Sequence, residues 1–250
     1  YMNLSKKAHP FYDFFKKIDI YQMEKLIAQV DSFTLLTKYM ADKMKVGRRP
    51  YIVVEGITDG TKLCFDTHKA CEKKIAYAGK LVEAFGVKRL IEAFSILTDQ
   101  EATLHICGGG ELRAYVEDAC KHDRRIHYYG VVSAEKANEI LRNADVLVNP
   151  RQNNDEYTKY SFPSKIVEYL MTGNAVVAYM LDGMPPIYKE MIYTPENNST
   201  KSLSKTILEA LHQKYIEEKR RVAQTYIDTQ LSPVVVSNRV IQLILSDGQM

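Results

Sequence analysis

The stretch YSFPSKIVEYLMTGNAVVAY, residues 160–179, decides the fold that we expect for this chain. It predicts a helix over 163–173, because Pro163 suits a first helical turn and Gly173 suits the left-handed residue that follows a last one. Residues 174–179 form a short apolar run rich in β-branched side chains, which predicts a buried strand. The stretch therefore describes a helix that leads directly into a core strand.

The predicted helix has two different faces, and its N-terminus opens from a serine-rich loop. Either Ser161 or Ser164 could cap it by accepting from N–H groups of the first turn. Such an N-terminus can receive phosphate, because its free N–H groups and the helix dipole both favour an anion. One face is apolar and the other polar: the first carries Ile166, Val167, Leu170 and Met171, and the second carries Lys165, Glu168, Tyr169 and Thr172.

Strands and helices alternate through the chain ahead of this stretch. The predicted strands are 75–78, 102–107, 126–129 and 145–148, and the helices between them are 87–97, 111–120 and 133–142. This alternation predicts βαβ units, a parallel sheet and right-handed crossovers. Glycine recurs where these strands end, which is typical of a doubly wound nucleotide-binding domain. The ligands of such a domain lie beyond the carboxyl ends of its strands.

Further elements flank this domain on both sides. The N-terminal side predicts a helix, a strand, a helix and a strand at 19–30, 32–37, 39–44 and 50–56. A polar segment at 59–74, with Gly60 as a breaker, reads as a linker. The C-terminal side predicts closing helices at 201–212, 213–226 and 234–245.

Composition excludes several classes of protein. A hydrophobic content of 46% with 26% charged residues is ordinary for a soluble globular protein, and a net charge of +3 gives no reason to expect nucleic acid as a partner. No apolar run approaches the ~18 residues that suggest a transmembrane helix. The four cysteines lack C-x-x-C spacing and read as reduced thiols of a cytoplasmic protein, and no His/Cys cluster has the spacing of a metal site.

Residues 160–179 resemble the signature of the family-four glycosyltransferases of GT-B fold, in particular the bacterial polysaccharide branch. SFTLLTKYMADKM and PYIVVEGITD, within 32–59, resemble the end of the N-terminal half of such an enzyme and the crossing into its C-terminal half. The resemblance implies an α/β chain of GT-B type, with a Rossmann-like doubly wound parallel sheet and a partial N-terminal domain. Its domains would be a remnant of the acceptor domain with the crossing, a linker, a nucleotide-sugar-binding domain and a C-terminal helix, at 1–58, 59–74, 75–230 and 231–250.

The same resemblance implies a function. We expect a retaining glycosyltransferase that moves a sugar from a UDP-sugar or another nucleotide-sugar to a surface polysaccharide or a lipid-linked saccharide. No metal or cofactor is implied, and no protein nucleophile is agreed for the family, so the catalytic residues stay unassigned. Because most of the N-terminal half is missing, we expect a fragment that binds its donor weakly and has little activity alone. Its basic, aromatic N-terminal region suggests peripheral contact with the inner face of an anionic membrane.

The resemblance also assigns roles to residues near the strand ends. Lys80, next to Gly79, matches the basic residue that contacts the donor diphosphate. Phe85 stands where the family often has a second lysine, so Lys88 or Lys165 would have to supply that charge. The remaining assignments follow the later strands: Gly130 and Val131 for the base, Arg151 for phosphate or sugar, Ser161, Phe162, Pro163, Ser164 and Lys165 for the diphosphate, and Glu168 for the ribose.

One position departs from the family pattern of two glutamates. Glu168 matches the second glutamate, but Tyr160 stands at the first, which contacts the donor sugar. Glu156 could substitute if the intervening residues form a looped-out insertion. This departure favours an alternative function, a nucleotide-binding or scaffold domain that has lost transferase activity.

Simpler interpretations and a second enzyme class remain open. Lys80 could be a solvated loop lysine, and Lys165 with Glu168 an ordinary surface pair three residues apart. Residues 108–110 are three glycines that read as turn residues, because they lack the spacing of a phosphate-binding loop. A UDP-sugar 2-epimerase of GT-B fold is the other enzymatic alternative, although no acid/base residues stand out for it. A dehydrogenase is disfavoured, because the dinucleotide fingerprint is absent.

Overall fold

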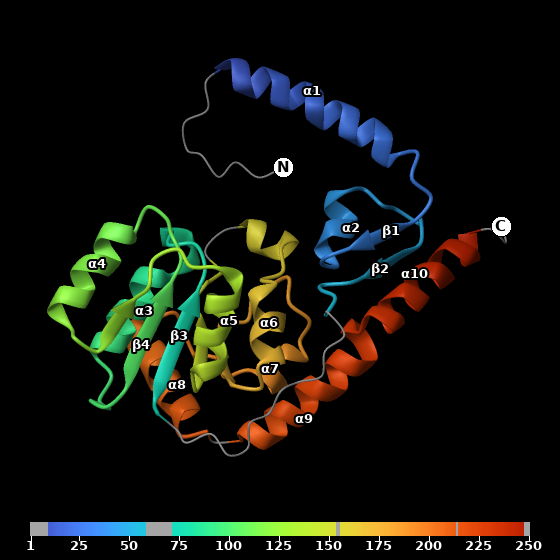
Figure 1. The fold of residues 1–250 in the computed structure, drawn as a ribbon. Helices are drawn as coiled ribbons and strands as arrows, with labels where there is room; N and C mark the ends of the chain where they lie inside the picture. The colour runs from blue at the N-terminus through green and yellow to red at the C-terminus, as the bar shows by residue number, and fades with distance from the viewer. Residues whose placement is uncertain (1–9, 59–71, 154–155, 214, 248–250) are drawn as a thin grey trace.

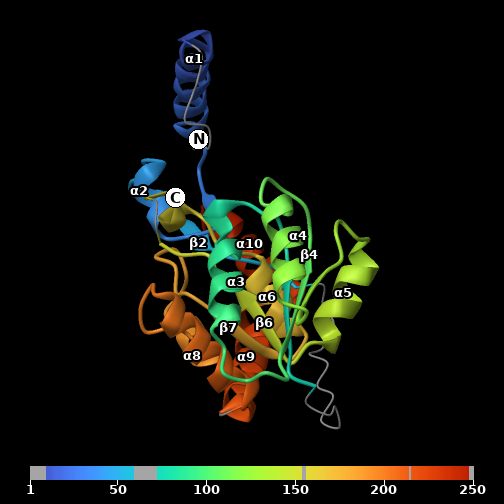
Figure 2. The same ribbon diagram turned by 90° about the vertical axis from the view of Figure 1, so that its left-hand side faces the viewer.

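The computed structural model of this chain describes residues 10–58, 72–153, 156–213 and 215–247. A five-stranded sheet with helices on both faces forms the larger part, and a small two-stranded sheet with α1 and α2 lies beside it (Figure 1). Figure 2 shows α1 (Pro10–Ile27) standing away from the rest of the molecule. None of the described helices has the length and apolar character needed to cross a lipid bilayer.

The large sheet is parallel throughout, as the alternation of strands and helices predicts. Its order is β5-β4-β3-β6-β7, so the chain starts in the middle, builds outward to one edge and then returns to build the other. Between β3 and β6 the order of winding reverses, and ligands of such folds bind outside this point. The strands are β3 (Lys74–Ala78), β4 (Thr103–Cys107), β5 (Ile126–Tyr128), β6 (Val146–Asn149) and β7 (Ala175–Ala178).

Two apolar layers cover the sheet. On one face, Ile75 and Leu104 pack with residues of α3 (Val87–Ser95), α4 (Arg113–His122) and α8 (Thr200–Leu211). On the other face, Ala76 and Leu147 pack with residues of four further helices. Those helices are α5 (Ala134–Asn143), α6 (Lys165–Met171), α7 (Tyr188–Met191) and α9 (Ile216–Tyr226). Alternate residues of β3, β6 and β7 thus enter opposite layers, as the pleat requires.

The N-terminal elements form a separate small unit. β1 (Phe33–Leu35) and β2 (Tyr51–Val53) pair in parallel, with α2 (Tyr39–Lys43) between them in sequence. The helix predicted at 19–30 is longer than expected on its N-terminal side. Most of the predicted linker lies outside the described residues, and its last residue, Lys74, already belongs to β3. The proposed domain boundaries stay predictions.

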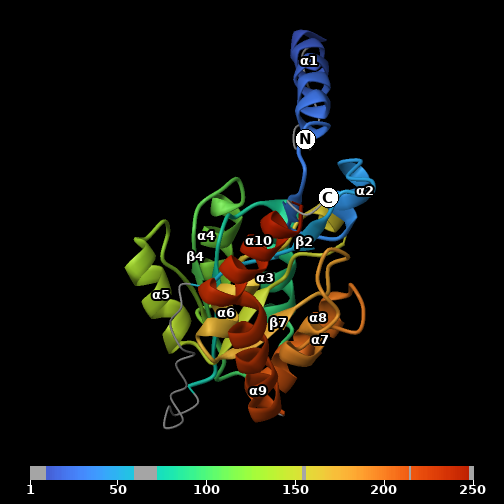
Figure 3. The same cartoon turned by 90° about the vertical axis from the view of Figure 1, so that its right-hand side faces the viewer.

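The C-terminal helices return to the N-terminal unit. After α9, a π-helical turn (Ile227–Leu231) leads into α10 (Pro233–Asp247), and Figure 3 shows α9 and α10 running one after the other along one side of the molecule. The N–H of Thr58 donates to the carbonyl of Leu231 at 3.0 Å. Arg239 of α10 donates from Nη2 to the carbonyl of Val53 at 2.7 Å. These bonds join the end of the N-terminal unit, at Val53 and Thr58, to the C-terminal helices.

Candidate functional site

A cavity of about 350 Å³ opens at the carboxyl ends of β3 and β6. It lies where the doubly wound fold predicts a ligand. Among the residues that line it are many of those predicted for the site: Gly79, Lys80, Arg151, Phe162, Pro163, Ser164 and Lys165. The structure therefore brings together residues that are up to 86 positions apart between Gly79 and Lys165. The lining also includes Tyr77, Ala78, Phe85 and Tyr169, to which no binding role was assigned from the sequence, and Asn149, which with Pro150 and Arg151 was expected to face this crevice.

The loop that carries Lys80 rests directly on the backbone of the glycine segment. The N–H of Gly79 donates to the carbonyl of Cys107 at 3.1 Å, and the N–H of Leu81 donates to the carbonyl of Gly109 at 2.9 Å. A Cβ at Gly108, whose φ is +136°, would lie 1.8 Å from the carbonyl oxygen of Gly79. Gly108 is therefore needed for close contact between backbones, a role that a turn alone would not require.

Tyr169 corrects the predicted division of α6 into two faces. It was expected on the polar face, but it is only 1% exposed. Its hydroxyl donates to the carbonyl of Ala78 at 3.3 Å and accepts from the N–H of the same residue at 3.2 Å. Burial raises the pKa of Tyr169 well above its usual range. A tyrosine ring can be buried where its hydroxyl forms hydrogen bonds with backbone groups. Here the hydroxyl of Tyr169 bonds to Ala78, the last residue of β3, and so holds the strand end that precedes Gly79.

Neither of the two serines predicted as caps of α6 forms a capping hydrogen bond. Ser164 stands at the N-cap position in helical conformation and its side chain makes no capping hydrogen bond. Ser161 Oγ instead accepts from Arg151 Nη2 at 2.9 Å. The predicted caps are therefore wrong, because a residue that already has helical φ and ψ cannot turn its side chain onto the first N–H groups. Gly173 ends the helix at φ +73°, as predicted.

A polar pair stands on the exposed side of α6. Lys165 Nζ lies 2.6 Å from Glu168 Oε2, and their side chains are 43% and 49% exposed. Such an exposed pair contributes little to stability. Lys165 lines the cavity, whereas Glu168 is one turn further along the helix and is absent from the lining. The assignment of Glu168 to a ribose stays a prediction.

The loop before α6 folds as a 3₁₀ helix, η2 (Glu156–Tyr160), which sequence reasoning did not predict. Tyr160 donates from its hydroxyl to Glu156 Oε1 at 3.2 Å. The side chains of Glu156 and Tyr160 therefore meet across one turn of the 3₁₀ helix, and the residues between them do not form a looped-out insertion. Below η2, a Cβ at Gly183 would lie 2.9 Å from the carbonyl oxygens of Thr158, Lys159 and Ser161, so the loop after β7 supports η2 backbone against backbone.

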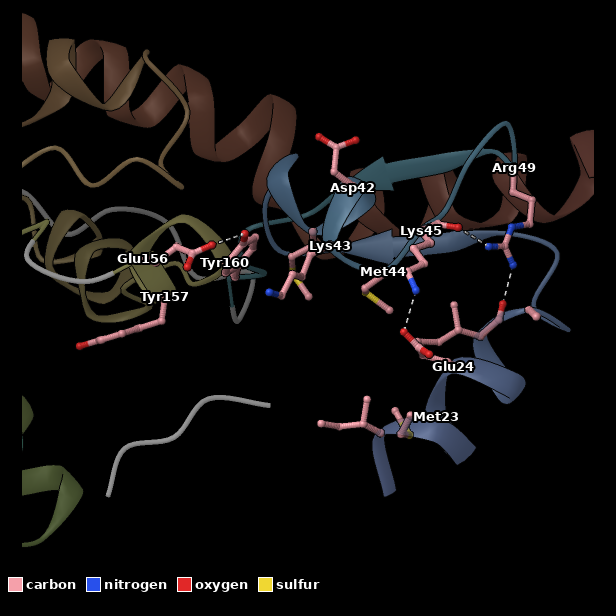
Figure 4. Close-up of a pocket in the computed structure, with 14 residues that line it drawn as sticks. Met23, Glu24, Asp42, Lys43, Met44, Lys45, Arg49, Glu156, Tyr157 and Tyr160 are labelled. Atoms are coloured by element: carbon pink, nitrogen blue, oxygen red, sulfur yellow. Dashed lines mark hydrogen bonds and ion pairs between the residues drawn. The ribbon is translucent and has the colours of Figure 1, made fainter. Parts of the chain in front are cut away.

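Tyr160 and Glu156 also border a second, larger cavity of about 1250 Å³ (Figure 4). Its other walls are α1, α2 and the loop that carries Arg49. Met23 of α1 and Met44 near α2 supply apolar surface, and Lys43 Nζ lies 5.4 Å from the centre of the Tyr160 ring. Nothing in the sequence placed α1 and α2 beside η2, because their approach depends on tertiary contacts.

The segment after β5 approaches the glycines without lining the smaller cavity. Gly130 has φ +69°, and its carbonyl accepts from the N–H of Gly108 at 2.8 Å. The side chain of Val131 is 82% exposed. Both residues lie at the same edge of the sheet as Gly79, yet neither is among the residues that line the cavity. Their assignment to a nucleotide base stays a prediction.

Comparison with known proteins identifies similar sequences and folds. The family described as "Glycosyl transferases group 1" matches residues 72–213, which is more than half of the chain. An uncharacterized glycosyltransferase of Methanocaldococcus jannaschii is 29% identical over 125 residues, which are 48% of this chain and 30% of that protein.

Solved structures share the fold. A variant of TarM from S. aureus, in complex with UDP, fondaparinux and alpha-GlcNAc-glycerol, superposes with a TM-score of 0.71 at 16% identity and covers 100% of this chain and 49% of that chain. HepE of Anabaena, in complex with UDP, has a TM-score of 0.67 at 14% identity and covers 87% of this chain and 64% of that chain. The chain therefore spans less than a third of the curated relative and about half of TarM.

Proposed function

The chain belongs to the group 1 glycosyltransferases, and from this premise we propose that its cavity at the ends of β3 and β6 holds the diphosphate of a nucleotide-sugar donor. A UDP-sugar is our first choice, because UDP is present in the solved TarM and HepE complexes. The sugar passes with retention of configuration to a saccharide, either a surface polysaccharide or a lipid-linked chain. The convergence of Lys80, Arg151 and Lys165 on one cavity carries this proposal.

The cations suit the difficult part of the reaction. When the bond between sugar and diphosphate breaks, negative charge grows on the departing nucleotide. Fixed cations and N–H donors in a partly enclosed site stabilise this charge more than water does, because they need no reorganisation. In our proposal these groups replace a metal ion, and no cofactor takes part. Lys80 acts as a point charge, while Phe162, Pro163 and Ser164 form the wall that the phosphates approach.

The nucleoside is placed beside the diphosphate cavity. Glu168 accepts hydrogen bonds from the two ribose hydroxyls, for which a carboxylate has the necessary lone pairs. This requires Glu168 to exchange its contact with Lys165, an exposed pair of small net stability. The base lies against the backbone of Gly130 and Val131. Tyr160, whose hydroxyl donates to Glu156, is the residue that we assign to the donor sugar.

The acceptor would approach from the larger cavity between α1, α2 and η2. In this proposal residues 1–58 are the remnant of an acceptor domain with the crossing, 59–74 the linker, 75–230 the donor domain and 231–250 the C-terminal helix. The chain alone is expected to have little transferase activity, because part of the reacting site belongs to the rest of the acceptor domain. We place the protein in the cytoplasm of a bacterium, at the inner face of the membrane. The exposed rings of Phe14 and Phe15 with Lys17 on α1 support contact with anionic lipids.

Calorimetric titration of the chain with UDP, GDP and ADP tests the donor site. We expect one nucleotide to bind with a Kd of about micromolar to millimolar strength and Glu168→Ala to weaken it. Absence of binding by all three would contradict the proposal for this chain. Incubation with UDP-N-acetylglucosamine, followed by a search for the 2-epimer, separates transfer from the epimerase alternative.

A second candidate function is a nucleotide-binding domain without transferase activity. One observation favours it: Tyr160 takes the place of a carboxylate, and its hydroxyl is engaged by Glu156. A donor-hydrolysis assay on the full-length protein distinguishes the two functions. Release of free sugar and nucleotide supports a transferase, whereas tight nucleotide binding with no release supports the non-catalytic domain.

A further inference from the structure

The larger cavity has an apolar wall and a polar end (Figure 4). The apolar wall is built from α1, α2 and the residues directly after them, namely Ile20, Met23, Ile27, Ala28, Met40 and Met44. Three of these are methionines, whose flexible thioether side chains adapt to ligands of different shape. The polar end is η2, which presents Glu156, Tyr157 and Tyr160. The cavity therefore suits a ligand that is itself part apolar and part polar.

The charged groups beside the apolar wall are already engaged. Lys45 Nζ lies 2.8 Å from Glu24 Oε1. The guanidinium of Arg49 donates to four backbone carbonyls. Sugar hydroxyls buried against this wall would lack hydrogen-bond partners, which is unfavourable. An apolar chain needs no such partners and gains free energy when it leaves water. The wall therefore favours an apolar chain over a segment of polysaccharide.

The polar end of the larger cavity adjoins the smaller cavity. Tyr157 lines the larger one, and the centre of its ring lies 5.0 Å from Cζ of Arg151, which lines the smaller one. The N-terminal unit holds η2 in place, because the buried Thr37 donates from Oγ1 to the carbonyl of Lys159 at 2.7 Å. A ligand with its polar end at η2 therefore faces the proposed donor site, while its remainder extends along the apolar wall.

Lys43 stands between the two kinds of surface. Its Nζ lies 5.4 Å from the centre of the Tyr160 ring, and Figure 4 shows it between Tyr160 and Met44. In the same view the side chain of Asp42 points away from it. Among the described residues Lys43 has no ion-pair partner, so its charge is available to a ligand. A phosphate at this point would gain a charge-assisted contact.

We propose that the larger cavity binds an acceptor saccharide that is linked through phosphate to a single apolar chain. The chain lies on the wall formed by α1 and α2, the phosphate meets Lys43, and the saccharide reaches η2. This inference rests on the proposed function and deepens it, because it selects the lipid-linked acceptor over a free polysaccharide. It also gives a role to Ile20 and Met23, which are apolar and yet exposed on α1.

Calorimetry with geranyl phosphate, geraniol and inorganic phosphate tests this site on the whole chain. The wild type should bind geranyl phosphate at least about tenfold more tightly than either part alone, because the chain and the phosphate contribute together. Lys43→Gln should weaken geranyl phosphate about tenfold and leave geraniol unchanged. Lys38→Gln removes a lysine outside the cavity and should bind geranyl phosphate as the wild type does.

Met23→Gln tests the apolar wall. Replacing the thioether by an amide should weaken both geranyl phosphate and geraniol about tenfold, whereas Met23→Leu should retain both affinities. Leu26→Gln is the matched control, because Leu26 also belongs to α1, is 59% exposed and does not line the cavity. Equal losses in Met23→Gln and Leu26→Gln, as expected for general adhesion of lipid to α1, overturn the proposal.

UDP titration of the same proteins separates this inference from the proposed function. The variants should bind UDP as the wild type does, which also shows that they fold. A chain that binds UDP but does not prefer geranyl phosphate to inorganic phosphate overturns the lipid-linked acceptor and keeps the donor site. A chain that binds geranyl phosphate through Met23 and Lys43 but binds no nucleotide supports the site for a lipid phosphate and overturns the proposed function.

Discussion

The hydroxyl of Tyr226 on α9 donates to Oε1 of Glu55, a residue 171 positions earlier that enters from the small N-terminal unit. Glu55 is buried at 6% exposure. Tyr226 packs edge-to-face on Tyr188, whose ring in turn lies 5.1 Å from that of Phe162 at the cavity. Contacts thus run without a break from the N-terminal crossing to the wall of the candidate site. Burial and the neighbouring Glu55 raise the pKa of Tyr226 above its usual range.

Removing this hydroxyl should destabilise the fold. Tyr226→Phe removes the hydroxyl that donates to the buried side chain of Glu55, so we expect a loss of about 1–3 kcal/mol in the free energy of unfolding. Urea denaturation followed by circular dichroism measures it. Tyr21→Phe is the control, because Tyr21 is exposed on α1 and should lose little. Equal effects of the two substitutions would contradict the importance of the bond.

Gly108 should tolerate no side chain. Its φ of +136° and the 1.8 Å approach of an added Cβ to the Gly79 carbonyl predict that Gly108→Ala lowers the free energy of unfolding by about 3 kcal/mol or more and displaces Lys80. Gly47→Ala is the matched control: Gly47 also has a positive φ, but its nearest contact is 4.0 Å away. That variant should lose only about 1–2 kcal/mol. Thermal melting and UDP titration measure both effects, and a stable, nucleotide-binding Gly108→Ala would refute the prediction.

Glu168 should matter for nucleotide binding far more than for stability. Its exposed pair with Lys165 contributes under about 0.5 kcal/mol, so Glu168→Gln should melt almost as the wild type does. If the carboxylate accepts from ribose hydroxyls, the same variant should bind UDP about tenfold more weakly. A 2′,3′-dideoxy analogue of UDP provides the control, because its affinity should be the same for both proteins. Equal losses for UDP and the analogue would place Glu168 away from the ribose.

The free energy of unfolding should fall in mild acid, because His105 resists protonation in the folded chain. Burial, followed by the charges of His127 and Lys74, lowers its pKa from 6.5 to about 4. The unfolded chain therefore binds a proton below pH 6.5 that the folded chain refuses until about pH 4. The free energy of unfolding should be highest above pH 6.5 and should fall between these two values, by about 1–2 kcal/mol after solvent screening.

Substitution of His105 separates this effect from other titrations. His105→Gln should flatten the stability profile between pH 6.5 and 4, as measured by denaturant unfolding at several pH values. His122→Gln, at an exposed position on α4, should keep the wild-type slope. A slope that persists in His105→Gln would assign the acid sensitivity to other groups.

Much of the fold follows from local patterns, because each strand and helix of the α/β domain carries its own apolar period and its own end signal. Gly173 illustrates this, since a helix end that needs positive φ selects glycine. Tyr169 shows the limit. Its place on the helix is predictable, but only the position of β3 shows that its hydroxyl can meet Ala78 in the core. Likewise, α7 and η2 are too short to show a period.

The candidate site was predictable to the level of the strand ends and no further. Lys80, Arg151 and the residues before α6 follow strands whose carboxyl ends share one edge, so their convergence could be foreseen. The surroundings of Arg151 could not. Phe85 and Tyr157 approach it from turns that are 72 positions apart, and no spacing in the sequence relates them. The sequence interpretation treated Phe85 as the place of a missing lysine. In the structure its ring instead contacts the guanidinium of Arg151.

Two hydrogen bonds described above, from Thr58 to Leu231 and from Arg239 to Val53, have a practical consequence. The small N-terminal unit is fastened to the C-terminal helices by hydrogen bonds and by the Glu55–Tyr226 contact, so it does not depend only on the covalent connection to β3. A protease cut between residues 58 and 72 would therefore leave two pieces that travel together through a sizing column. Shortening α10 ahead of Arg239 would remove one of these ties and leave the contacts of Thr58 with Leu231 and of Glu55 with Tyr226 in place.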